Sequence, residues 1–211
     1  MKELVIIGAG GFGRTVYWQC DADYGNGREW TIKGFLDDRK DILAGFNVPK
    51  PVLGSPFDYK GSADEIYLCA LGEPRMRRKY AAPLVAQGVE FINLCTEVAY
   101  PASAKLGHGI IFERKVQVGS DTRIGDFVTI LSMCVIGHDV TIGDYVEIAS
   151  FTFIGARARI GNDVQIHPHS CILPGVSVGD RSVIGAGSVV IHNVEPDTTV
   201  FGNPAKVVFK R

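Results

Sequence analysis

An apolar residue recurs at every sixth position of the chain from Leu106 to Val190. Stepping by six from Leu106 passes 15 apolar positions, of which 10 are isoleucine, and glycine directly follows nine of the 15. A helix needs apolar residues at 3.6-residue spacing and is destabilised by frequent glycine. The pattern predicts short strands joined by corners whose conformation glycine permits. Stacking of such units would bury a continuous column of isoleucine, which is a parallel β-solenoid.

The composition narrows the classes of partner and compartment. The 211-residue chain has a net charge of −1 and no block of Lys and Arg, so it offers no electrostatic support for binding nucleic acid or anionic membranes. Its five cysteines lack disulfide or metal-ligand spacing, which is typical of a reducing compartment. No apolar run approaches the ~20 residues of a membrane span, and Leu4–Ile7 is too short for a signal peptide. We therefore predict a cytoplasmic protein.

The chain before the repeats has the pattern of a nucleotide-binding βαβ unit. Leu4–Ile7 predicts a buried parallel strand, and Gly8–Gly13 follows it as G-x-G-x-x-G before a helix predicted over 14–21. Such glycines let a phosphate approach the backbone N–H groups at a helix N-terminus. The alternative is a tight βα turn that needs its glycines for packing only.

Acidic residues follow the second predicted strand, which spans 31–36. Asp37 and Asp38 then lie at the strand's carboxyl end, where a ribose or base lies in nucleotide folds. A complete dinucleotide domain needs two such halves. Residues 1–97 are therefore predicted to form one mononucleotide-binding half, which favours a nucleoside diphosphate over NAD, and residues 98–211 to form the solenoid.

A third strand is predicted over 65–71, and the helix after it carries Arg75, Arg77 and Arg78. These arginines could assist with phosphate binding. We interpret them instead as a solvated helix face.

Among the five histidines of the chain, His138 has the most distinctive surroundings. It is the second residue after Ile136, and with three six-residue repeats per coil its stacking neighbours lie 18 positions away, at the ~4.8 Å spacing of paired strands. Those neighbours are Ser120 and Ala156, both small, so the imidazole has free space beside it. A histidine side chain, with an ordinary pKa of ~6.5, suits general-base catalysis at neutral pH.

Other interpretations of these residues remain open. Asp139 either supports the imidazole or pairs with Arg157 on a solvated ridge. His167 and His169 resemble a metal pair but lack a third ligand at workable spacing. A non-catalytic solenoid would need no histidine in a row of small residues, and a metalloenzyme such as a hexapeptide-type carbonic anhydrase would need three converging histidines.

The repeats, followed by the motif FGNPAK near the end of the chain, resemble the bacterial hexapeptide-repeat acyltransferases with a left-handed β-helix. More closely, the chain is similar to the sialic acid O-acetyltransferase and nucleotide-4-amino-sugar N-acetyltransferase family. The shared motifs, in the same order, are GAGGFG, FLDD, ALGEP, IGHDVTIGDY and FGNPAK. The resemblance implies an α/β half-Rossmann-like N-terminal domain followed by an all-β left-handed parallel β-helix.

The resemblance also implies an activity and an assembly. The family transfers acetyl from acetyl-CoA to the 4-amino group of a UDP-, dTDP- or GDP-linked amino-deoxysugar for surface polysaccharide or glycan synthesis. O-acetylation of sialic acid or another sugar is the alternative. The family works as a homotrimer, with each site between two neighbouring solenoids, and no metal is expected.

Roles for individual residues follow from the same resemblance. His138 would be the catalytic base, supported by Asp139. The residues implied at the sugar nucleotide are Gly10, Gly11, Phe12, Asp37, Asp38 and Gly72. Those implied at acetyl-CoA are Glu147, Gly155, Ala156 and Ala186.

Overall fold

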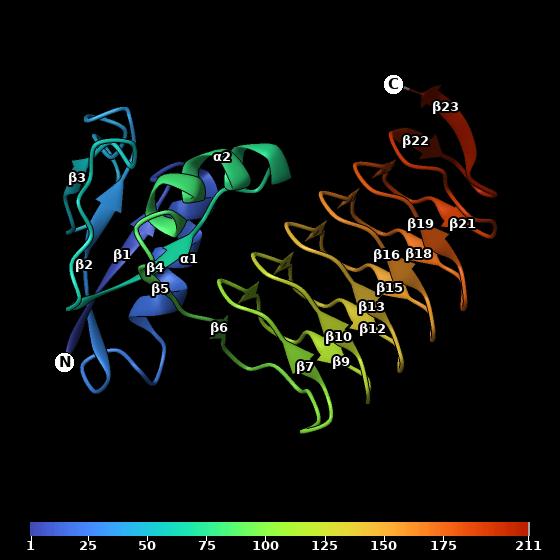
Figure 1. The fold of residues 1–211 in the computed structure, drawn as a ribbon, viewed down its shortest axis with the longest axis horizontal. Helices are drawn as coiled ribbons and strands as arrows, with labels where there is room; N and C mark the ends of the chain where they lie inside the picture. The colour runs from blue at the N-terminus through green and yellow to red at the C-terminus, as the bar shows by residue number, and fades with distance from the viewer. Residues whose placement is uncertain (211) are drawn as a thin grey trace. The chain divides into compact units, whose positions relative to one another are not determined.

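The structure is a computed structural model that describes residues 1–210. It divides the chain into two compact units, and the first of these ends at Leu94 (Figure 1). The boundary predicted from the sequence lies after residue 97. The two described helices have 11 and 12 residues, and neither is long and apolar enough to span a membrane.

The first unit is a parallel five-stranded sheet in the order β3-β2-β1-β4-β5. The strands are β1 (Lys2–Ile7), β2 (Trp30–Leu36), β3 (Val52–Gly54), β4 (Glu65–Cys69) and β5 (Glu90–Phe91). Helix α1 (Gly11–Asp21) follows β1, and α2 (Pro74–Val85) follows β4. Leu4–Ile7 is fully buried, as the apolar run predicts. Strand order reverses around β1, which places the loops after β1 and β4 at the edge where nucleotide folds bind ligands.

Several boundaries in this unit differ from the sequence prediction: α1 begins at Gly11 rather than at residue 14, and β1 and β2 begin at Lys2 and Trp30, two residues and one residue earlier than predicted. β4 ends at Cys69 rather than at residue 71, because the chain leaves the sheet before Leu71. β3 was not predicted, since its three residues are too few to show an alternating pattern.

The second unit is a solenoid of stacked coils, each turning through three parallel sheets (Figure 1). The β7 sheet contains β7 (Lys105–Leu106), β10 (Arg123–Ile124), β13 (Thr141–Ile142), β16 (Arg159–Ile160) and β19 (Ser177–Val178). The β8 sheet contains β6 (Leu94–Cys95), β8 (Ile111–Phe112), β11 (Thr129–Ile130), β14 (Glu147–Ile148), β17 (Gln165–Ile166), β20 (Val183–Ile184), β22 (Thr198–Phe201) and the antiparallel β23 (Lys206–Lys210). The β9 sheet contains β9 (Gln117–Val118), β12 (Val135–Ile136), β15 (Phe153–Ile154), β18 (Cys171–Ile172) and β21 (Val189–Val190).

The column of repeated apolar residues is the core of the solenoid, as the period of six predicts. Strands pair with the strands 18 residues away, for example Ile124 with Ile142. Fourteen of the 15 repeat positions are at most 6% exposed, and Leu106 is partly buried. Burial of an isoleucine side chain contributes about 1.5–3 kcal/mol, so this column dominates the stability of the unit.

The glycines of the repeat have a different role from the one predicted. The left-handed backbone conformation falls on the third residue after each apolar position, and that residue is usually not glycine: φ is 57° at Asp139 and 56° at Tyr145. The glycines are required because the coils stack too closely for a side chain. A Cβ on Gly137 would lie 2.6 Å from the backbone nitrogen of Ala156 in the next coil. The prediction that these glycines supply the turn conformation is therefore wrong.

Candidate functional site

His138 and Asp139 form a corner of the solenoid between β12 and β13. The Nδ1 atom of His138 lies 2.6 Å from Oδ2 of Asp139, and both side chains are about half exposed. When Nδ1 carries the hydrogen and donates it to the carboxylate, Nε2 keeps its lone pair. Among residues 1–210, nothing hydrogen-bonds to Nε2, so this nitrogen can accept a proton from a bound molecule.

The surroundings of the pair agree with the predicted stacking. The backbone N–H of Asp139 donates to the carbonyl of Ser120 in the preceding coil, at 2.9 Å. The backbone N–H of Arg157 donates to the carbonyl of His138, also at 2.9 Å. Within the described residues no ion pair joins the side chains of Asp139 and Arg157. The alternative in which Asp139 serves only to pair with Arg157 is therefore wrong.

The residues predicted for acetyl-CoA fall in two places on the solenoid. Gly155 and Ala156 occupy the corner directly above His138, one coil further along the chain. Glu147 lies on β14 in the β8 sheet, where its Oε2 accepts from Nε2 of Gln165 at 2.9 Å. Ala186 is exposed at the corner between the β8 and β9 sheets. Within one chain, only Gly155 and Ala156 adjoin the histidine.

His167 and His169 do not belong to a recognisable metal centre. The ring of His169 stacks on Phe151, with centroids 4.9 Å apart and planes within 1°. Among residues 1–210, no three His, Cys, Asp or Glu side chains are grouped as metal ligands would be.

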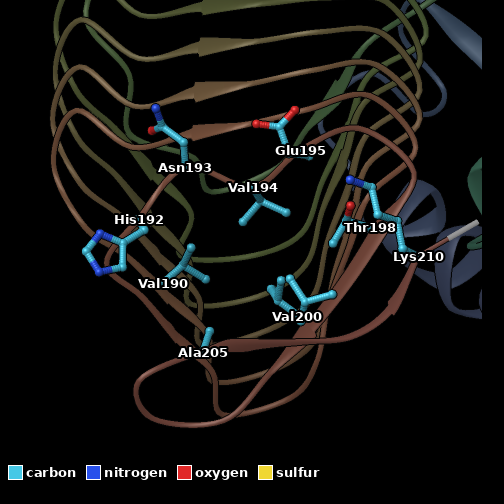
Figure 2. Close-up of a pocket in the computed structure, with 10 residues that line it drawn as sticks. Val190, His192, Asn193, Val194, Glu195, Thr198, Val200, Ala205 and Lys210 are labelled. Atoms are coloured by element: carbon cyan, nitrogen blue, oxygen red, sulfur yellow. The ribbon is translucent and has the colours of Figure 1, made fainter.

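A cavity of about 190 Å³ lies at the last coils of the solenoid. Figure 2 shows Val190, Val194 and Val200 inside it, with His192 and Glu195 around them. None of the predicted site residues lines this cavity. The cavity lies at the end of the solenoid's apolar core and is separate from the corner that holds His138 and Asp139.

In the first unit, the glycine loop joins β1 tightly to α1. Gly8 has a φ of +94°, and a Cβ there would lie 2.8 Å from Cδ2 of Leu71. A Cβ on Gly13 would lie 1.9 Å from the carbonyl oxygen of Gly8. Gly10 is the N-cap residue of α1, and no side chain caps this end of the helix. The first turn of α1 contains no acidic residue, and Gly11 is exposed. The packing interpretation therefore holds for Gly8 and Gly13, while Gly10 and Gly11 leave open backbone at a helix N-terminus.

Asp37 is tied to this loop. Its carboxylate is buried; it accepts from the backbone N–H of Ala9 at 3.0 Å and from three nitrogens of Arg39: the backbone N at 3.0 Å, Nε at 2.9 Å and Nη2 at 3.1 Å. Burial raises the pKa of Asp37, but the hydrogen bonds from Arg39 and Ala9 outweigh it and hold the pKa below its ordinary value. A carboxylate accepts about four hydrogen bonds, so Asp37 has no acceptor position left for a ligand.

The other predicted nucleotide residues lie at the same edge of the sheet. Asp38 is exposed and accepts from Oγ of Ser55 at 2.6 Å and from the hydroxyl of Tyr80 at 2.8 Å. Phe12 lies in the first turn of α1 and is half-buried. Gly72 follows β4, and its carbonyl accepts from Nη2 of Arg77 at 2.7 Å.

Arg77 departs from the sequence interpretation. Arg75 and Arg78 are exposed, as a solvated helix face requires, but Arg77 is fully buried. Its Nε also donates to the carbonyl of Leu71, at 2.7 Å. The backbone carbonyls of the β4–α2 loop thus satisfy a guanidinium that burial would otherwise penalise. The interpretation of Arg77 as part of a solvated helix face is therefore wrong. Its hydrogen bonds stabilise the loop that contains Gly72.

Fold and site together define a β-solenoid with an exposed histidine–carboxylate pair at one corner and a separate nucleotide-fold unit. The bacterial transferase hexapeptide model (six repeats) matches residues 121–156 and 157–192, and the PglD N-terminal domain model matches residues 3–84. The chain belongs to the hexapeptide-repeat acyltransferases with this N-terminal domain, the family that its motifs indicated. Its fold is an α/β half-Rossmann-like unit followed by a left-handed parallel β-helix.

Two solved structures resemble the chain over nearly its whole length. The acetyltransferase domain of PglB from Neisseria gonorrhoeae is 27% identical with a TM-score of 0.87, over 99% of this chain and 100% of that one. PerB from Caulobacter crescentus, solved with CoA and GDP-perosamine, is 24% identical with a TM-score of 0.87, over 99% and 98%.

Curated relatives match a much shorter segment. A chloramphenicol acetyltransferase of Agrobacterium fabrum is 52% identical over 40 residues, which is 19% of each chain. The chain spans about a fifth of the length of the curated relatives that it matches.

Proposed function

We propose that the protein transfers the acetyl group of acetyl-CoA to the 4-amino group of a UDP-, dTDP- or GDP-linked amino-deoxysugar, for surface polysaccharide or glycan synthesis. The observation that carries the proposal is the His138–Asp139 pair, with Nε2 free at an exposed corner. The PglB acetyltransferase domain, which has also been solved with acetyl coenzyme A, supports the choice of acetyl donor. The strand order of the first unit, with the glycine loop at the edge where nucleotide folds bind ligands, supports a nucleotide-linked acceptor.

The chemistry of the pair fits amide formation from a thioester. The sugar amine attacks the thioester carbon, and Nε2 of His138 takes a proton from the nitrogen as the C–N bond forms. Asp139 holds the ring in the required tautomer and stabilises the imidazolium. Collapse of the tetrahedral intermediate breaks the C–S bond, and the imidazolium returns the proton to the departing sulfur of CoA.

We propose that the active unit is a homotrimer of about 69 kDa, three times the 22.9 kDa chain. The outward face of the β9 sheet is mostly apolar: Val135 and Phe153 are 39% and 42% exposed, and Gln117 is its exposed polar residue. The β7 sheet instead presents Arg123 and Arg159. Covering the β9 face with a second copy would remove apolar surface from water.

The same assembly accounts for the scattered acetyl-CoA residues. Glu147 and Ala186 lie at other positions around the coil than Gly155 and Ala156, so one chain does not gather them. A site between two neighbouring solenoids would let both sets approach one acetyl-CoA. We expect the enzyme to work in the cytoplasm, since all five cysteines are free thiols.

The test begins with thermal shift of the purified protein against UDP, dTDP and GDP. Acetyl-CoA turnover then follows with 4-amino sugars linked to the nucleotide that stabilises the protein, and with sialic acid as competitor. Acetylation of the amine, identified by mass spectrometry, is expected. Turnover with sialic acid and none with any nucleotide-linked amine would refute the proposal in favour of O-acetylation.

A further inference from the structure

Arg39 is an exposed side chain held in one fixed position. Its side chain is 64% exposed, yet Nε and Nη2 both donate to the buried carboxylate of Asp37 in a bidentate pair. An exposed arginine ordinarily samples many rotamers, and fixing it costs up to about 2 kcal/mol of side-chain entropy. The hydrogen bond from Ala9 to Asp37 fixes this guanidinium relative to the glycine loop.

The fixed guanidinium stands beside the start of α1. Its Nη2 lies 3.9 Å from the point that a Cβ on Gly10 would occupy. Gly10 is the N-cap of α1, which has no acidic residue in its first turn. A positively charged fork thus adjoins backbone N–H groups that have no intrahelical partner, and both attract anions.

Hydrogen-bond capacity remains on the exposed side of Arg39. A guanidinium has five N–H donors, and the pair with Asp37 uses two of them. Within residues 1–210 the other three donate to no side chain or carbonyl. The carboxylate of the nearby Asp38 accepts hydrogen bonds from the hydroxyls of Ser55 and Tyr80 rather than from Arg39. The donors that are left are the kind that bind phosphate oxygens.

We propose that Arg39 binds the diphosphate of the sugar nucleotide and that Asp37 is a positioning residue that acts through it. The inference rests on the proposed function, because that function supplies the nucleotide. Under this proposal Asp37 has a different role from the one that the resemblance implies. Its carboxylate does not contact the base or ribose, because its four acceptor positions are filled. It instead fixes the guanidinium of Arg39 beside the glycine loop. Arg39 is then the direct ligand contact, and it selects nucleoside diphosphates over nucleosides.

The test measures binding to the full-length protein by calorimetry with UDP, dTDP and GDP, and by ligand-observed NMR with the matching nucleosides. Arg39→Ala should weaken diphosphate binding about 10- to 100-fold, the range for a hydrogen bond to a charged group, and leave nucleoside binding nearly unchanged. Arg39→Lys keeps the charge but not the fork, so its loss should be intermediate. Lys40→Ala, the same charge change at the next exposed position, is the control.

The positioning role is tested with Asp37→Asn and the double variant with Arg39→Ala. If Asp37 acts through Arg39, the two losses in diphosphate affinity do not add. Additive losses would overturn the positioning role. Circular dichroism checks folding, and Arg39→Lys replaces Arg39→Ala if the latter unfolds.

Two failures are distinguishable. If the wild type binds a diphosphate and Arg39→Ala binds it as tightly as Lys40→Ala does, only the role of Arg39 is refuted. If the wild type binds none of the three diphosphates, the sugar-nucleotide acceptor is refuted, and the role of Arg39 with it.

Discussion

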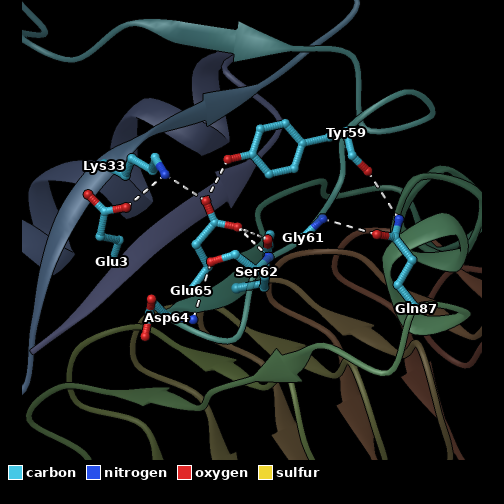
Figure 3. A network of polar contacts seen from close by, with 9 residues as sticks. Glu3, Lys33, Tyr59, Gly61, Ser62, Asp64, Glu65 and Gln87 are labelled. Atoms are coloured by element: carbon cyan, nitrogen blue, oxygen red, sulfur yellow. Dashed lines mark hydrogen bonds and ion pairs between the residues drawn. The ribbon is translucent and has the colours of Figure 1, made fainter.

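Glu65 offers a measurable test of how the nucleotide-fold unit is held together. It begins β4, and its side chain is only 2% exposed. The carboxylate accepts from Nζ of Lys33 at 2.7 Å, the hydroxyl of Tyr59 at 2.6 Å and the backbone N–H of Ser62 at 3.0 Å (Figure 3). It also accepts from the hydroxyl of Tyr67. These bonds fasten the connection between β3 and β4 to the sheet. We predict that Glu65→Gln destabilises this unit at neutral pH.

The magnitude follows from the pKa of Glu65. Burial alone would raise this pKa, but the hydrogen bonds from Lys33, Tyr59, Tyr67 and Ser62 outweigh burial and lower it from 4.5 to about 2. The difference of about 2.5 units corresponds to about 3 kcal/mol at 1.36 kcal/mol per unit. Because the folded-state pKa is the lower one, this contribution is complete above about pH 4.5. It is lost as the pH falls through about 2.

Urea unfolding followed by tryptophan fluorescence measures the effect, since Trp18 and Trp30, the only two tryptophans, both lie in this unit. Glu65→Gln keeps the shape of the side chain but places an amide NH₂ among hydrogen-bond donors. We expect a loss of about 3 kcal/mol at pH 7, and a difference from wild type that shrinks by about 1.4 kcal/mol per pH unit below 4.5.

Glu3→Gln is the matched control. Glu3 also pairs with Lys33, at 2.7 Å, but its side chain is 47% exposed. Exposed ion pairs contribute about 0–1 kcal/mol, so this variant should stay close to wild type. A Glu65→Gln loss no larger than that of Glu3→Gln would refute the reasoning. So would a loss that is the same at pH 7 and pH 3.

Three further predictions concern the proposed enzyme. His138→Ala should lower turnover about 10²–10⁴-fold while assembly and acetyl-CoA binding survive. Asp139→Asn should lower turnover by a smaller factor. If His138→Ala retains more than about half of the wild-type rate, the base lies elsewhere. Light scattering should give a mass of about 69 kDa, three times 22.9 kDa, and a monomer at micromolar concentration would remove the site between subunits. Steady-state kinetics of Asp37→Ala should show a higher KM for the sugar nucleotide with that for acetyl-CoA nearly unchanged, and equal effects on both would mean that the unit is misassigned.

The solenoid was predictable because its period fixes which side chains point inward. Once the period of six is recognised, the buried column and the stacking of Ser120, His138 and Ala156 follow from counting alone. The role of the glycines did not follow, because it depends on the distance between neighbouring coils. That distance leaves 2.6 Å between a Cβ on Gly137 and the nitrogen of Ala156.

In the first unit, the element types were predictable and the side-chain partners were not. Asp37 binds Ala9, which lies 28 residues earlier, and no local pattern reports such a contact. Arg77 had a local signal. It shares the spacing of Pro74, Ala81 and Leu84, the buried positions of α2, so it lies on the apolar stripe of the helix. Its charge led to the opposite interpretation, because an arginine is seldom fully buried unless its donors have partners.

The geometry of the corner explains how two adjacent residues form the histidine–carboxylate pair. In an extended strand, successive side chains point to opposite faces, so His138 and Asp139 could not meet there. The left-handed φ of 57° at Asp139 turns the chain, and its carboxylate lies 2.6 Å from Nδ1 of the imidazole. His108 and His192 are also second residues after repeat positions, but Gly109 and Asn193 follow them, so neither has a carboxylate next to it in the sequence. Of these three histidines, only His138 combines a following carboxylate in the left-handed position with a small neighbour in the next coil.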